Sequence, residues 1–197
     1  MVILGGCQPK DEPLPARAAE AAEKKAEVLE QNAAAGGDQA EPSRSQVIGK
    51  REVQAVDPAG EQLLDDPITC LARTIYWEAR GEEGVSMEAV ASVVMNRLGH
   101  ERFPDTVCAV VRQGREHGAC QFSWWCDGRS DRARDDESYA TAKEIARRAL
   151  NLELRDRTGG ALYFHHRKVT PGWSTAYRKT AEIGDFVFYK PPGGDAK

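Results

Sequence analysis

Residues 66–82 read DPITCLARTIYWEARGE and carry the strongest physical signal in the chain. Asp66 stands directly before Pro67, a pairing that is typical of a helix start. The carboxylate can accept hydrogen bonds from the free backbone amides, and proline fits the first turn. Gly81 is a stop signal, because glycine readily takes the backbone conformation that ends a helix. The stretch therefore predicts a helix from Ile68 to about Arg80.

A glutamate lies on the apolar face of this predicted helix. At about 3.6 residues per turn, Glu78 shares a stripe with Ile68, Leu71 and Ile75. Burying an ionised carboxylate is costly, so such a group tends to raise its pKa and keep its proton. A carboxyl that is protonated near neutral pH can act as a general acid. The alternative is an ordinary buried ion pair between Glu78 and Arg80 or another arginine.

The rest of the later region alternates helix signals with short apolar runs. Apolar residues at helical spacing, with caps or glycine stops, predict helices over 86–98, 104–114 and 138–152. Residues 161–165 and 186–189 are short, aromatic-rich runs typical of strands. Helices dominate over a small C-terminal β element, so we expect the α+β class.

Composition divides the chain near residue 65. All fourteen aromatic residues lie at or after Tyr76, whereas residues 8–65 are rich in Ala, Glu, Gln and Pro. We therefore expect 8–65 to be a disordered tether, with a transient helix at most, and 66–192 to be the folded domain. The tether has seven basic against twelve acidic residues, and 66–197 has twenty against nineteen. Neither balance favours a nucleic-acid partner, which needs clustered basic charge.

Four of the five cysteines lie in the later region, and this even set favours two disulfides in an oxidising compartment. Three pairings are open; we favour Cys120–Cys126 and Cys70–Cys108. Four buried thiols are the alternative. Zinc is disfavoured, because no two cysteines have the Cys-x2-4-Cys spacing of structural zinc sites.

The fifth cysteine follows a short apolar run. Residues 4–7 read LGGC and resemble the lipobox of bacterial lipoproteins, in which the cysteine is acylated. Residues 1–7 then form a truncated lipoprotein signal, since a full signal has a basic start and a longer apolar run. Lipidation at Cys7 would anchor the chain to a membrane; a chance match is the alternative. No run approaches the ~18 apolar residues of a membrane span.

Several blocks between residues 66 and 190 resemble the SleB-like cell wall hydrolase family, in the family's order and spacing. They are IYWEARGE (75–82), AVASVVMNR (89–97), FPDTV (103–107), CQFSW (120–124), ALYFH (161–165), PGW (171–173) and IGDFVFY (183–189). The resemblance implies a lysozyme-like fold and cleavage of the MurNAc–GlcNAc β-1,4 bond of peptidoglycan. It also implies an exported protein of the periplasm or cell envelope that needs no cofactor.

The resemblance places the catalytic glutamate at Glu78. Further substrate-binding positions fall in two blocks: Gln121, Phe122, Ser123 and Trp124, and then Tyr163, His165 and Trp173. Tyr163 departs from the family pattern, in which histidine is common. For each aromatic residue, packing in the core is the alternative to stacking on a sugar ring.

Two routes of glycan cleavage remain open. Hydrolysis needs a second carboxylate, and Glu82 would lie on the stripe of Glu78 if the helix continued past Gly81. Local capping or pairing with Arg80 is the alternative for Glu82. A lytic transglycosylase instead uses one glutamate as acid and then base, while the 6-hydroxyl of muramic acid closes an anhydro ring. The resemblance favours this second route.

Two rival classes complete the alternatives. A zinc-dependent wall amidase is disfavoured, because the four histidines form no His-Glu-x-x-His motif, and we expect no metal. A non-catalytic peptidoglycan-binding module would keep the fold without turnover. The need for a protein activator stays open.

Overall fold

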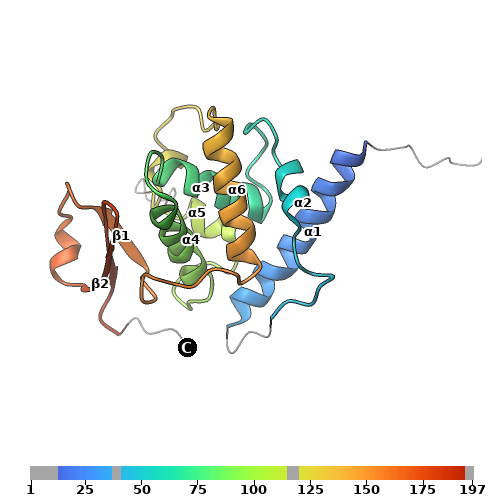
Figure 1. Cartoon of the computed structure of the whole chain (residues 1–197). Helices are drawn as coiled ribbons and strands as arrows, with labels where there is room; N and C mark the ends of the chain where they lie inside the picture. The colour runs from blue at the N-terminus through green and yellow to red at the C-terminus, as the bar shows by residue number, and fades with distance from the viewer. Residues whose placement is uncertain (1–12, 37–40, 115–119, 194–197) are drawn as a thin grey trace, which may run out of the picture.

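The computed structural model describes residues 13–36, 41–114 and 120–193. Figure 1 shows a helical body between two flanking parts, the N-terminal helix on one side and a small sheet on the other. The helices are α1 (Leu14–Ala35), α2 (Lys50–Ala55), α3 (Pro67–Glu78), α4 (Gly84–Leu98), α5 (Val107–Arg112) and α6 (Asp136–Leu150). The strands are β1 (Tyr163–His166), β2 (Arg178–Ile183) and β3 (Phe186–Lys190). The α+β class is confirmed.

Helix α3 lies at the centre of the body and begins as the sequence predicts. The Asp66 side chain accepts a hydrogen bond from Thr69 N at 2.9 Å, and Pro67 occupies the first turn. The helix ends at Glu78, before Gly81, whose φ of +85° turns the chain away. It packs against α4, α5 and α6. Glu78 is therefore the last helical residue, at the edge of the core that α3 organises.

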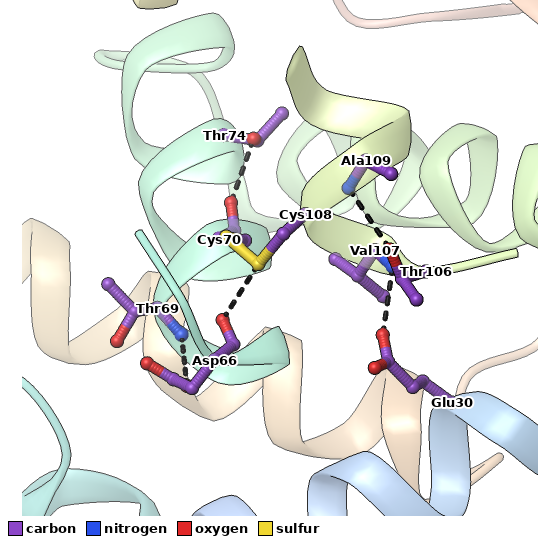
Figure 2. Close-up of a disulfide and its surroundings, with 9 residues drawn as sticks. All are labelled: Glu30, Asp66, Thr69, Cys70, Thr74, Thr106, Val107, Cys108 and Ala109. Carbon is purple, nitrogen blue, oxygen red and sulfur yellow. Dashed lines mark hydrogen bonds between the residues drawn. A yellow bond between two sulfur atoms is a disulfide. The ribbon is translucent and has the colours of Figure 1, made fainter. Parts of the chain in front are cut away.

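Both favoured disulfides are present. Cys70–Cys108 joins α3 to α5, with 5.3 Å between the Cα atoms (Figure 2). Cys120–Cys126 closes a short loop around a 3₁₀ turn, η2 (Ser123–Trp125). The four-thiol alternative is excluded by these two bonds.

The prediction of a disordered tether over 8–65 is wrong for the part that the structure describes. Helix α1 buries Ala22, Ala26, Leu29 and Ala33 along one stripe, and the following segment buries Ile48, Val53 and Val56. The small alanine side chains let α1 approach α3 and α4 closely, so the segment joins the core without any aromatic residue. Residues 8–12 and 37–40 lie outside the described residues.

Polar contacts also hold this N-terminal segment. Asp57 is fully buried and pairs with Arg73 of α3 at 2.6 Å, and Tyr139 of α6 donates a hydrogen bond to the same carboxylate at 2.7 Å. A Glu30 carboxylate oxygen accepts from Val107 N at 2.8 Å and so caps α5, as Figure 2 shows. Each contact gives a buried charge a partner.

The sheet is antiparallel in the order β1-β3-β2. Phe164 of β1 pairs with Phe188 of β3, and both rings pack against the core. The next pair in register, Tyr163 and Tyr189, projects to the opposite face. The sequence predicts β1 and β3 to within a few residues but misses β2. That strand is a partly exposed edge, rich in charged residues, and has no aromatic run.

Candidate active site

Glu78 lies at the C-terminal end of α3 and is half-buried. Burial raises the pKa of its carboxyl to about 7, and the positive charge of Arg97 opposes that rise. Within the described residues, no hydrogen bond or ion pair holds the carboxyl. A carboxyl in this state can be protonated or ionised near neutral pH, which suits proton transfer in both directions.

The alternative ion pair between Glu78 and Arg80 is not found. The Arg80 guanidinium instead lies over the rings of Tyr76 and Trp77, at 5.5 Å and 5.8 Å from their centroids. Arg80 is exposed, so its charge stays in solvent while its plane covers aromatic surface.

Glu82 does not share the stripe of Glu78, because α3 ends before it and the chain turns. Its carboxylate lies with His166 and Asp185, and the ligand atoms of the three residues are all within 4.8 Å of one another. Three such groups could hold a cation, and they form the one such cluster in the described ranges. The role of Glu82 as a second catalytic carboxylate therefore remains a prediction, without the helical geometry on which it depended.

The aromatic site residues of the C-terminal block come together on one face of the sheet. Tyr163 and His165 lie on β1, and Trp173 lies on η3 (Gly172–Thr175), with its ring centroid 5.6 Å from Tyr163 and 5.8 Å from His165. His165 Nε2 is 3.1 Å from the Tyr189 hydroxyl, and the two rings stack. All three predicted residues are half-buried, so part of each ring can be reached.

Two members of this aromatic cluster are missed by the sequence reasoning. The Tyr177 ring centroid lies 5.1 Å from that of Tyr163 and 5.3 Å from that of Trp173. Tyr189 on the neighbouring strand β3 is the register partner of Tyr163. Strand alternation could have identified Tyr189, since it pairs in register with a predicted site residue. Tyr177 follows an irregular turn, and no local signal marks it.

The block at residues 121–124 divides between the surface and the core. Gln121 and Ser123 are exposed, and the Gln121 side-chain oxygen accepts from Arg97 Nη2 at 3.3 Å. Phe122 is fully buried and Trp124 is 6% exposed. Contrary to prediction, these two rings pack in the core and offer no stacking face, because the 3₁₀ turn directs them inward.

The described residues do not include Cys7, so its lipidation stays a prediction. None of the helices in the described ranges is long and apolar enough to cross a membrane.

The chain is similar in sequence to cell wall hydrolases and spore cortex-lytic enzymes. The profile of the Cell Wall Hydrolase family matches residues 81–189. The spore cortex-lytic enzyme of Halalkalibacterium halodurans is 36% identical over 66% of this chain and 36% of its own length. That of Oceanobacillus iheyensis is 31% identical over 79% of this chain and 55% of its own. The chain thus spans about a third to just over half of these curated relatives.

Solved structures agree with these sequence matches. The catalytic domain of the Bacillus cereus SleB protein aligns with a TM-score of 0.52 and 30% identity, over 66% of this chain and 93% of that domain. The catalytic domain of the germination-specific lytic transglycosylase SleB from Bacillus anthracis aligns equally well, over 98% of its length. These domains have a lysozyme-like fold, which confirms the predicted architecture. The family profile covers more than half of the chain. We conclude that this chain belongs to the Cell Wall Hydrolase family.

Proposed function

We propose that this protein cleaves the glycan strands of peptidoglycan at the MurNAc–GlcNAc β-1,4 bond, as a lytic transglycosylase with Glu78 as acid and then base. The observation that carries the proposal is the Glu78 carboxyl, whose pKa of about 7 arises from burial and which has no bonded partner in the described ranges. The likeness to catalytic domains of SleB proteins supports the same reaction. Because Glu78 precedes the residues that the family profile matches, its role rests on its own chemistry.

The proposed reaction needs one carboxyl and no added water. Glu78 donates its proton to the glycosidic oxygen, and the bond from that oxygen to C1 of the muramic acid breaks. The Glu78 carboxylate then takes the proton of the muramic 6-hydroxyl, whose oxygen forms a new bond to C1. The products are a 1,6-anhydro-muramic end and a free GlcNAc hydroxyl, and Glu78 regains its proton. A pKa near neutrality serves both steps.

The aromatic cluster is the proposed place for the sugar rings. Tyr163, His165 and Trp173 offer half-buried rings with polar edges, which suit the apolar faces and hydroxyls of a saccharide. Gln121 and Ser123, both exposed, are proposed to hydrogen-bond sugar substituents.

Hydrolysis by a muramidase mechanism is the second candidate. It would use Glu78 as the acid and Glu82 as the carboxylate that activates water. Its specific support is that Glu82 is half-buried close to the sheet, although its nearest acidic and imidazole neighbours, Asp185 and His166, favour a different role. A non-catalytic peptidoglycan-binding module is the third candidate.

The site of action is proposed to be outside the cytoplasm. Two disulfides indicate an oxidising compartment, and peptidoglycan is extracytoplasmic. Anchoring to a membrane through a lipidated Cys7 and regulation by a protein activator are proposals that need their own tests.

The deciding experiment digests purified sacculi with the full chain and identifies the soluble fragments by mass spectrometry. Glu78→Gln is run alongside, and Glu82→Gln is the matched control. Anhydro-muramic ends from the wild type and Glu82→Gln, with none from Glu78→Gln, are the expected result. Reducing ends that disappear in Glu82→Gln would establish hydrolysis instead. Binding to sacculi with no released fragments from any protein would contradict the enzymatic proposal.

A further inference from the structure

Arg97 lies in the last turn of α4 and is 2% exposed. Its guanidinium lies over three rings from different parts of the chain, with centroids at 5.2 Å for Phe103, 5.1 Å for Phe122 and 5.4 Å for Tyr163. Aromatic faces on this many sides immobilise the side chain and attract its charge. The guanidinium is therefore a fixed positive charge against the Tyr163 ring of the aromatic cluster.

The hydrogen bonds of Arg97 leave part of its donor capacity unused. Nε donates to Leu162 O at 2.8 Å, and Nη2 donates to the Gln121 side-chain oxygen at 3.3 Å. Nη1 is buried and has no hydrogen-bond partner among the described residues. Every hydrogen bond that is made goes to a neutral oxygen, so no carboxylate pairs directly with this buried charge. Three rings and two neutral oxygens therefore surround this buried charge, and no carboxylate lies within ion-pair distance of it among the described residues.

The carboxyl that interacts electrostatically with Arg97 is Glu78. Arg97 lowers the pKa of Glu78 against the effect of burial. In turn, burial lowers the pKa of Arg97 to about 10, while Tyr163 and Glu78 oppose that change, so Arg97 remains charged at neutral pH. Burial and the neighbouring Tyr177 raise the pKa of Tyr163, whereas the charges of Arg97 and Arg102 lower it. Tyr163 of β1 is thus the further titratable group that acts on Arg97, and Tyr177 and Arg102 act on Tyr163 in turn.

We propose that Arg97 is a positioning residue that acts through Glu78: its fixed charge stabilises the carboxylate that forms when Glu78 gives its proton to the glycosidic oxygen. This inference rests on the proposed function and adds a second residue to it. The bond to Leu162 O, next to β1, aligns the charge with the sheet that carries the aromatic cluster. Nη1 has no hydrogen-bond partner among the described residues, so the guanidinium charge is not committed to another carboxylate. Such preorganised charge is a large source of rate enhancement in enzymes.

The first test compares pH profiles of fragment release from sacculi by the full chain. Arg97→Met removes the charge but keeps an apolar chain among the rings, and Arg97→Lys restores a charge. Asn96→Ala is the matched control, since Asn96 precedes Arg97 and holds the same loop through Ala161 O without bearing charge. For Arg97→Met we expect an alkaline limb that moves up by about one pH unit and a rate at pH 7 that falls roughly tenfold or more. Asn96→Ala keeps the wild-type limb, and Arg97→Lys recovers part of the shift.

A second test does not depend on whether Arg97 variants fold. In the wild type, the guanidinium ¹⁵N resonances of Arg97 are followed by NMR from pH 5 to 9. We expect them to titrate with the pKa of Glu78 and to lose that titration in Glu78→Gln. An Arg97 signal that does not respond, or an Arg97→Met profile that matches that of the wild type, would overturn this inference. The proposed function would still be supported if Glu78→Gln were inactive. A fully active Glu78→Gln would instead overturn the proposed function.

Discussion

At the scale of one residue, burial of the Glu78 carboxyl lowers the free energy of unfolding near neutral pH. Its carboxyl is half-buried at the end of α3, where burial raises its pKa and the charge of Arg97 opposes that rise. The folded protein therefore binds this proton more tightly than the unfolded chain does, because the pKa rises from 4.5 to about 7. Sites that need perturbed groups commonly have this cost.

The stability of Glu78→Gln follows from that shift. A raised folded-state pKa contributes stability that is fully present below pH 4.5 and lost as the pH rises through about 7. The neutral amide of the variant does not titrate, so it causes no loss of stability over this pH range. We expect the variant to gain free energy of unfolding relative to the wild type between these pH values, up to at most about 3 kcal/mol, less the screening due to partial exposure. Urea unfolding at pH 5 and pH 8 measures the difference, and the exposed neighbour Glu83→Gln should show no comparable gain.

In the proposed mechanism the same protonation governs the rate. There the protonated Glu78 donates to the glycosidic oxygen, so kcat/KM should fall as the pH rises through about 7. Initial rates of fragment release at several pH values measure this limb. A rate that keeps rising to pH 9 would show that the first proton comes from another group.

At the scale of elements, the attachment of the N-terminal segment depends on a few buried polar links. Asp57 joins the segment after α2 to Arg73 of α3 and Tyr139 of α6, and neither Asp57 nor Arg73 is more than 2% exposed. Burial alone would raise the pKa of Asp57, but hydrogen bonds from Gln62, Tyr139 and Arg73 and the charge of Arg73 lower it overall. The link is therefore ionised under ordinary conditions and weakens only in acid, as the pH falls through this lowered pKa.

Removing that carboxylate should loosen the whole segment. Asp57→Asn keeps the size of the side chain and tolerates the positive φ of 43°, but it leaves Arg73 charged and unpaired. We expect a loss of about 3–5 kcal/mol in the free energy of unfolding. The exposed pair Glu20–Lys24 of α1 provides the contrast, since solvent screens this pair and Glu20→Gln should leave the free energy of unfolding nearly unchanged. Equal losses in chemical denaturation of the two variants would contradict the assigned role of Asp57.

At the scale of the whole molecule, the two disulfides close loops of very different length. Cys70–Cys108 spans 38 residues and joins two core helices, whereas Cys120–Cys126 spans only 6. Closing the longer loop removes more entropy from the unfolded chain.

The two bonds should therefore differ in their effect on stability. Replacing Cys70 and Cys108 together by alanine should lower the free energy of unfolding by about 4 kcal/mol, and replacing Cys120 and Cys126 by about 2 kcal/mol. Urea denaturation of both double variants under oxidising conditions checks the order. A larger loss for the Cys120–Cys126 variant would mean that its loop stabilises the fold through other contacts.

The sequence alone determined the features that depend on near neighbours. The capped start of α3, the glycine after its end and the helical stripe that includes Glu78 are all encoded within a few turns of chain, as are the periodic cores of α4 and α6. The family blocks then predicted the architecture and the reaction class. The number of cysteines and the expected compartment predicted two disulfides, whereas the pairing was one favoured choice among three until the structure showed it.

Contacts between groups that are far apart in the sequence became visible in the folded chain. The tertiary structure placed the alanine stripe of α1 in the core, directed Phe122 and Trp124 inward, and brought Glu82 to His166 and Asp185. It also set Arg97 among three rings, where its charge and that of Glu78 influence each other's pKa. These outcomes depend on packing and burial, which are properties of the assembled chain, and a local pattern carries no information on what covers it.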